Sequence, residues 1–528
     1  MKIEQAKNQY SRFNGKPFRQ HQREAIEAIH NTKKPVMIVK APTGAGKSLM
    51  GMALGELYPK FAYLCSSKAL QDQLSREFSG EVQILKGRSN YPCAWSTGMN
   101  AAQCINSQNT PCPEQSRCAY KVQKRKVDQS RRQVLNYPYV LSEFNYVGSM
   151  NSGEPYPIMM ADEADVLEGL LTNFISLSIF RYNISKWGLD TPPFKTFSET
   201  NANAWIEWAR GLNRKLRAKL DYVSDQIANC SGMQPYEQLD LQKEQKELEN
   251  LLSKVRIFSQ NVDKTWIANL HDKYSEFKPL WLKPELAQQY YWRHAEKHVL
   301  MSATWPSKEI ISRSLGIPLG DIDMIEVPSI FPVGANPVNL CNVGDMSRKT
   351  INTSLPYIVA AVNRILSFHA NHKGIIHTGN YRVAEAIMST GNPRLISHNS
   401  YNKQDQIEMF MDSSKPRVFV SPSSTRGMDL PDDFCRFTIT AKAPFQSLGD
   451  KFTAGRMFSK PIGQKWYTSS CAQEIEQGVG RGMRSADDWC ENYILDIAAC
   501  RMITSHPGLF GQYFLDSRTF CNVDNLAA

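Results

Sequence analysis

The stretch that most constrains the fold is Val36-Met-Ile-Val-Lys40-Ala-Pro-Thr-Gly-Ala-Gly-Lys-Ser48. A short β-branched, apolar run ends in a glycine-containing loop, and a segment rich in Leu, Met and Ala follows. This order predicts a strand, a P-loop and a helix, with Ala41 where the usual pattern has its first glycine. The sequence therefore predicts an α/β domain that binds a nucleoside triphosphate.

The residue types of this loop suit phosphate chemistry. Gly44 and Gly46 let backbone N–H groups curl around a phosphate, and the N-terminus of the following helix points at the same anion. We expect Lys47 to reach the β- and γ-phosphates and Ser48 to hold Mg²⁺. The other loop residues expected to bind the nucleotide are Thr43 and Ala45.

Three polar residues outside the loop complete the predicted nucleotide site. Gln22 lies in an amphipathic segment before the loop, and its amide can both donate to and accept from an adenine edge. The apolar run from Ile158 ends in Asp162 and Glu163. We expect Asp162 to complete the Mg²⁺ shell and Glu163 to orient or deprotonate the attacking water.

Four of the twelve cysteines are concentrated in one polar segment rich in Pro and Asn, at positions Cys93, Cys104, Cys112 and Cys118. Such a segment has little core of its own, which indicates that a metal organises it. A [4Fe–4S] cluster and a structural Zn²⁺ both fit, and the spacing alone does not choose between them. The polar N-terminus and the lack of a run near ~18 apolar residues favour a reducing cytoplasm, where thiols are commoner than disulfides.

Positive charge points weakly to a polyanionic partner. The formal net charge is +11, and basic residues follow the cysteine segment in Lys121-Val-Gln-Lys124-Arg-Lys126 and in Arg131-Arg132. A run of this kind beside a metal module is suited to guide a phosphate backbone, although it is often only a solvated face.

The remaining sequence divides into a helical part and a second α/β part. From roughly Gly169 to Tyr291, apolar residues repeat at helical spacing over 206–227 and again over 241–262, which predicts an antiparallel helical hairpin inserted into the α/β fold. From about Thr350, strands and helices alternate again without a second P-loop, which predicts another parallel sheet. The expected strands are 374–377, 394–397, 417–421, 436–440 and 493–496.

Two segments of this second part carry candidate nucleotide contacts. Gly427 and Asp429 combine a turn glycine with a carboxylate after a strand. Gln477, Arg481 and Arg484 are spaced to share one helical stripe. Guanidinium groups at that spacing can reach a γ-phosphate held by another domain and stabilise charge as it is transferred.

In order, Gln22, Ala41–Ser48, Ser66–Gln73, Asp162–Asp165, Ser302–Thr304, Gly427–Asp429 and Gln477–Arg484 resemble the motifs of a superfamily 2 helicase. The cysteine segment and the helical insertion resemble the XPD/DinG branch of iron–sulfur helicases. The resemblance implies two RecA-like domains with ATP in the cleft, a [4Fe–4S] cluster on the four cysteines, a helical arch and 5′→3′ movement on single-stranded DNA. One departure is Asp165, where this branch usually has His.

The resemblance and the residue patterns together predict the domain order. The fold class is α/β, with an iron–sulfur module and a helical arch inserted into the first of two RecA-like parallel-sheet domains. Only a short segment precedes Gln22, so we expect no N-terminal exonuclease of the kind that some relatives carry. The expected boundaries are 1–90, 136–168 and 291–335 for the first RecA-like domain, 91–135 for the cysteine module, 169–290 for the arch and 336–528 for the second RecA-like domain.

The predicted activity is ATP-dependent 5′→3′ DNA unwinding with ATP, Mg²⁺ and a [4Fe–4S] cluster. The expected partners are single-stranded and forked duplex DNA, with no membrane, and the expected state is a monomer in a prokaryotic or phage-infected cytoplasm. Two alternatives stay open. One is an ATP-driven translocase that strips protein or remodels RNA, and the other is an ATP-gated nucleic-acid clamp with a structural zinc module.

Overall fold

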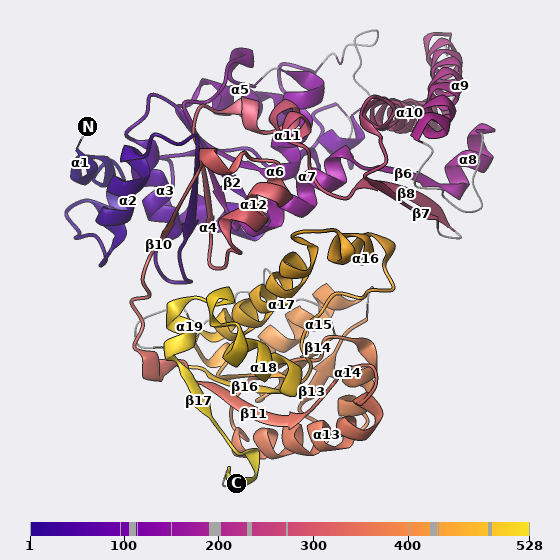
Figure 1. The fold of residues 1–528 in the computed structure, drawn as a ribbon. Helices are drawn as coiled ribbons and strands as arrows, with labels where there is room; N and C mark the ends of the chain where they lie inside the picture. Colours follow the sequence, from indigo (N-terminus) through magenta and orange to yellow (C-terminus); the bar gives the residue numbers. More distant parts are fainter. Residues whose placement is uncertain are drawn as a thin grey trace.

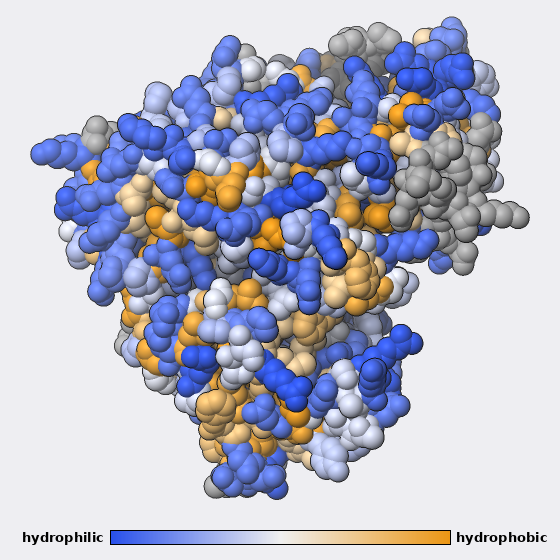
Figure 2. Space-filling model, in the orientation of Figure 1, coloured by the Kyte–Doolittle hydropathy of each residue, from blue (hydrophilic) through white to orange (hydrophobic). Residues whose placement is uncertain are grey.

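Two α/β domains lie one above the other, and an insertion extends from the upper one, in the computed structural model that Figure 1 shows. The structure describes residues 2–95, 97–104, 112, 114–148, 150–189, 202–229, 235–270, 273–399, 401–422, 430, 432–483 and 488–526. Across these ranges, no helix combines the length and the apolarity needed to cross a bilayer. On the face shown in Figure 2, hydrophobic side chains form patches between hydrophilic ones.

The first domain is built on a seven-stranded parallel sheet in the order β10-β1-β9-β5-β2-β4-β3. Its four central strands β1, β9, β5 and β2 are buried along their whole length, because helices cover both faces of the sheet. The strands are β1 (Val36–Lys40), β2 (Phe61–Cys65), β3 (Gln83–Ile84), β4 (Arg132–Asn136), β5 (Ile158–Asp162), β9 (His298–Ser302) and β10 (Ile322–Glu326).

Helices α1 and α2 of this domain precede β1, and the other helices lie in the connections between strands. Their bounds are α1 (Ile3–Lys7), α2 (Gln22–Asn31), α3 (Lys47–Gly55), α4 (Lys68–Glu77), α5 (Ala119–Gln129), α6 (Tyr137–Ser142), α7 (Leu167–Ile175), α11 (Pro284–Tyr290) and α12 (Lys308–Leu315). Strand register brings the functional ends together, since Lys40 pairs with Ser302 and Asp162 pairs with Met301. Strands β1, β5 and β9 therefore end at one edge of the sheet.

The insertion contains the predicted helical hairpin, formed by α9 (Ala202–Ala228) and α10 (Pro235–Asn261), which pack against each other. Its base holds a three-stranded antiparallel sheet that the sequence did not lead us to expect, in the order β6-β8-β7. Strand β8 alternates half-buried and buried residues, and its Phe277 packs on Trp205 and Phe258 of the hairpin. The bounds are β6 (Leu177–Phe180), α8 (Arg181–Trp187), β7 (Trp266–Leu270) and β8 (Tyr274–Pro279).

The second domain has a seven-stranded parallel sheet in the order β13-β14-β12-β15-β16-β11-β17. The five predicted strands are confirmed as β12 (Gly374–His377), β13 (Leu395–Ser397), β14 (Val418–Ser421), β15 (Phe437–Thr440) and β16 (Glu491–Asp496). The prediction missed β11 (Val338–Gly344) and the edge strand β17 (Arg518–Phe520). The helices are α13 (Ile351–Phe368), α14 (Tyr381–Met388), α15 (Lys403–Asp412), α16 (Lys451–Phe458), α17 (Gly463–Val479), α18 (Ile497–Ser505) and α19 (Gln512–Asp516).

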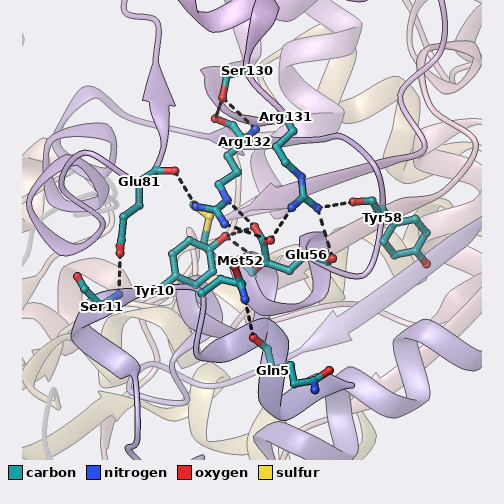
Figure 3. A network of polar contacts seen from close by, with 11 residues as sticks. Gln5, Tyr10, Ser11, Met52, Glu56, Tyr58, Glu81, Ser130, Arg131 and Arg132 are labelled. Carbon is teal, nitrogen blue, oxygen red and sulfur yellow. Dashed lines mark hydrogen bonds and ion pairs between the residues drawn. The ribbon is translucent and has the colours of Figure 1, made fainter. Parts of the chain in front are cut away.

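A buried carboxylate ties the N-terminus to the first domain (Figure 3). The side chain of Glu56, which follows α3, is fully buried and pairs with Arg131 at 3.0 Å and Arg132 at 2.7 Å. Tyr10 donates its hydroxyl to the same carboxylate at 2.9 Å. In the basic run, Lys124 pairs with Glu143. These three basic residues thus have acidic partners within the fold, and the role of the basic run as a phosphate guide stays a prediction.

Candidate active site

The P-loop lies between the end of β1 at Lys40 and the start of α3 at Lys47. Gly44 and Gly46 have φ of +80° and +77°, which favours glycine. A Cβ on Gly44 would also lie 2.3 Å from the Phe331 ring, and one on Gly46 would lie 2.3 Å from Gln22 Nε2. The loop is therefore held in shape from both sides. Thr43 and Ala45 lie in the loop itself, and Ser48 lies in the first turn of α3.

Lys47 and Gln22 both contact backbone carbonyls of the loop. Lys47 Nζ donates to Ala41 at 3.2 Å and to Pro42 at 3.4 Å. Gln22 is buried, donates to Ala45 at 2.8 Å and accepts the backbone N–H of Arg19 at 2.9 Å. Gln22 thus supports the loop itself, and its contact with an adenine edge stays a prediction.

The two predicted Mg²⁺ ligands meet around a tyrosine that sequence reasoning missed. Tyr63 of β2 donates its hydroxyl to Asp162 at 2.7 Å and also contacts Ser48. Burial, together with the negative Asp162, raises the pKa of Tyr63, so its hydroxyl stays protonated and able to donate. Ser48 and Asp162 therefore lie together with oxygen donors of the kind that Mg²⁺ prefers. Tyr63 sits in an apolar run, so its sequence signal is that of a core residue.

Glu163 follows Asp162 in a left-handed conformation, with φ of 50°. This conformation is uncommon for a residue with a side chain, and such strain is concentrated at functional sites. The backbone N–H of Glu163 donates to Asp162 at 2.9 Å, and Ser66 hydrogen-bonds its carboxylate. Ser66, which begins one of the motifs of the resemblance, here orients the candidate general base.

Asp165 joins the two domains. It accepts the Ser302 hydroxyl at 2.7 Å and the Gln477 amide of α17 at 3.0 Å. Gln477 also donates to Thr304 Oγ1 at 2.8 Å. Ser302 and Thr304, at and just beyond the end of β9, thus reach the second domain through hydrogen bonds. Asp165, which stands where the resembling branch usually has His, takes part in that link.

Arg481 lies directly after α17, in a 3-10 turn over Gly480–Gly482. The predicted single helical stripe is therefore wrong at this point, because α17 ends at Val479 where glycines at 478, 480 and 482 weaken the helix. Burial and the Arg481 guanidinium lower the pKa of His377, at the end of β12, to about 4. The predicted residues Gly427, Asp429 and Arg484 lie outside the described residues.

These groups surround a cavity of about 560 Å³ between the two domains. This volume lies within the range of about 300–1,000 Å³ found for small-molecule sites. Its walls include P-loop residues, the candidate general base, the residues that link the two domains and the arginine after α17. These are Thr43, Lys47, Glu163, Asp165, Ser302, Thr304, Gln477 and Arg481.

The four predicted cluster ligands lie in the segment between β3 and α5, and each is half-buried. Backbone hydrogen bonds from Cys93 to Met99 and from Ala101 to Tyr91, both 2.9 Å, close a loop over residues 91–101. Cys104 follows three residues after this loop closes. Among the described residues, no three His, Cys, Asp or Glu side chains are grouped closely enough to hold a metal. The thiols suit a metal by type and exposure, but the described geometry does not gather them around one.

Two protein families match separate parts of the chain. Residues 358–502 match the helicase C-terminal domain, and residues 15–164 match the res subunit of type III restriction enzymes. No curated protein matches the sequence.

Solved structures similar to the chain include one titled "XPD_Helicase", with a TM-score of 0.64 and 14% identity over 96% of this chain and 100% of the other. A structure titled "XPD_APO" has a TM-score of 0.59 and 14% identity over 95% of this chain and 100% of the other. The structure of S. tokodaii Xpd4 has a TM-score of 0.57 at the same identity, over 95% of this chain and 100% of the other.

A P-loop domain facing a second RecA-like domain across a nucleotide-sized cleft resembles the core of a superfamily 2 helicase, and the two family matches fall on these two domains. At 14% identity, these structural similarities show that the fold is shared. In fold, the chain is similar to these XPD structures along nearly its whole length. Helicases of this kind use ATP and Mg²⁺.

Proposed function

We propose that the chain moves 5′→3′ along single-stranded DNA and unwinds forked duplex DNA as it hydrolyses ATP. The observation that carries the proposal is the contact of Gln477 with both Asp165 and Thr304 across the cleft. Because the cavity contains groups from both domains, hydrolysis depends on how closely the domains approach. Closure and reopening during each cycle can then move one domain along the strand.

Each predicted side chain has a role in this scheme. Lys47 and the P-loop N–H groups bind the β- and γ-phosphates, while Ser48 and Asp162 hold Mg²⁺, which neutralises charge on the transferred phosphoryl group when bound. Glu163 orients the water and accepts its proton. Arg481, together with Arg484, stabilises the negative charge of the transition state. Further proposed nucleotide contacts are Gln22, Thr43, Ala45, Gly427 and Asp429.

Substitution of Lys47 tests the ATPase. Lys47→Ala should abolish DNA-stimulated phosphate release and leave the melting temperature of the free protein close to that of the wild type. Within the described part of the chain, the hydrogen bonds of Lys47 Nζ go to loop carbonyls, so its loss removes charge from the phosphate site without opening the core. Retained DNA-stimulated hydrolysis in this variant would contradict the assignment.

Fork assays test the substrate and the direction. Forks of DNA and RNA with either a 5′ or a 3′ single-stranded tail should be separated only when the DNA carries a 5′ tail. Preference for RNA, or displacement of bound protein without strand separation, would favour the remodelling motor. Tight binding with very slow hydrolysis would favour the nucleic-acid clamp.

We also propose that Cys93, Cys104, Cys112 and Cys118 hold a [4Fe–4S] cluster. The support is four half-buried thiols in one segment with few apolar residues of its own. The cluster would be structural, because hydrolysis requires no electron. Anaerobically purified protein should contain about four irons per chain and absorb visible light. Cys112→Ser should lose that absorbance and unwinding while keeping part of the ATPase; one zinc per chain would refute the cluster.

A further inference from the structure

Lys40 is a buried cation directly before the P-loop. It ends the otherwise apolar strand β1, is 8% exposed and lines the cleft. A buried ammonium is costly unless acidic or polar groups surround it. Among the described residues of its own domain, its ion-pair partner is Glu326 of the neighbouring strand β10, 3.9 Å away. At this distance the pair is a weak contact, and Glu326 is half-exposed.

The second domain packs directly on this ammonium. Gly511 precedes α19, and its backbone N–H donates to Glu476 of α17 at 3.0 Å. A Cβ built on Gly511 would lie 2.7 Å from Glu476 Oε1 and 3.2 Å from Lys40 Nζ. The Lys40 side chain, the Glu476 carboxylate and the Gly511 backbone therefore meet, and a methyl group on Gly511 would have to displace the end of one of these side chains.

The contact links the two halves of the candidate active site. Lys40 is joined by a short loop to Lys47, and Glu476 immediately precedes Gln477 on the helix that leads to Arg481. Gln512 adds a longer backbone contact to Glu326, at 3.4 Å. A shift at Lys40 would thus move the phosphate-binding loop relative to the helix whose residues close the site.

We propose that Lys40 is a positioning residue for hydrolysis. Through its contact with Glu476 and the backbone of Gly511, it sets the distance between the P-loop and α17. The proposal rests on the proposed ATPase, and it assigns Lys40 no contact with the nucleotide. A displacement of about 1 Å between reacting groups can cost about a hundredfold in rate, so a small change at this contact should lower turnover more than nucleotide binding.

A pair of glycine substitutions tests the steric part. Gly511 has φ of −72°, which alanine adopts freely, so Gly511→Ala adds a methyl group and little backbone strain. Gly508→Ala is the matched control three residues away, because a Cβ there meets nothing within 4 Å. Gly511→Ala should lower kcat at least about tenfold and leave the Kd for ADP within about twofold. Gly508→Ala should match the wild type.

A double-mutant cycle tests the electrostatic part without relying on hydrolysis. The melting temperatures of Lys40→Met, Glu476→Gln and the double variant should be non-additive, because each single change removes the same contact. A wild type without ATPase would refute the proposed function, while this cycle would still decide whether the contact exists. Additive melting temperatures, or a Gly511→Ala variant that behaves as Gly508→Ala in kcat, would overturn the proposal.

Discussion

At position 165, an acidic residue accepts hydrogen bonds from both domains, from Ser302 in the first and Gln477 in the second. A carboxylate suits this place because it offers acceptors in two directions. Ser302 can reverse its hydroxyl and accept, whereas the Gln477 amide nitrogen can only donate. The geometry at this residue therefore depends on one acceptor facing Gln477 more than on the negative charge itself.

This asymmetry predicts different outcomes for two substitutions at Asp165. Asp165→Asn should lower kcat only a few-fold, since its amide oxygen can face Gln477 while its nitrogen donates to Ser302. Asp165→Leu removes both bonds, and at about 1.5 kcal/mol for each charge-assisted bond kcat should fall on the order of a hundredfold. Steady-state hydrolysis with saturating DNA measures both. Equal losses in the two variants would show that charge, not acceptor geometry, matters.

Glu56 also depends on its bonding partners, but its role is in stability and not in the active site. Its carboxylate is fully buried between Arg131 and Arg132, and Glu56→Ala would leave both guanidiniums without it. Breaking a buried pair costs about 3–5 kcal/mol, and the 41% exposure of Arg131 places the expected loss toward the lower figure. Chemical denaturation of the first domain should detect it. Glu27→Ala, which removes the exposed Arg23 pair, is the control and should change little.

Among the elements, strands covered on both faces were the most predictable. Runs such as that of β1 or β12 are continuously apolar and end in turn residues, so the sequence alone locates them. The short β6-β8-β7 sheet was missed because its strands are two or three alternations long and lie beside strong helical patterns. The nucleotide loop and its acids were predictable, whereas Tyr63 and Lys40 acquire their roles only through strand register.

Helix α16 connects the second domain to the base of the insertion. Its Arg456 is 2% exposed, donates Nε to Leu280 at 2.6 Å, pairs with Glu168 and lies 4.4 Å from the Trp281 ring centroid. Glu168 sits on α7, one turn after Asp165. The arginine therefore joins the insertion, the second domain and the segment that follows the active-site acids.

Arg456→Lys should loosen this connection although it keeps the charge, because lysine lacks the planar group that donates and stacks at once. Hydrogen exchange should rise in both α16 and β8, with the first sheet protected as in the wild type. Arg364→Lys is the control, since Arg364 pairs with Asp524 on the surface. Faster exchange in α16 alone would contradict a connection to the insertion.

Over the whole molecule, the contacts of α17 and α19 hold the two domains against each other around one cavity. Gln477 reaches Asp165 and Thr304, while Glu476 and Gly511 meet Lys40 deeper in the cleft. The contacts of Gln477 involve neutral groups and the carboxylate of Asp165, whereas the contact at Lys40 includes Glu476, a carboxylate whose protonation depends on burial. Domain closure should therefore respond to pH through Glu476.

Burial raises the pKa of Glu476 to about 7, with Lys40 opposing the rise and Glu326 adding to it. A carboxyl whose pKa is higher in the folded contact than its usual value near 4.5 stabilises that contact at low pH. The stabilisation should be complete below about pH 4.5 and be lost as the pH rises through 7. The melting temperature of the wild type relative to Glu476→Gln should thus fall as the pH rises from about 4.5 to about 7, and level off above that. Lys40→Met should move the midpoint of that fall to higher pH, because it removes the charge that favours the ionised carboxylate; a midpoint moved to lower pH would place Lys40 away from Glu476.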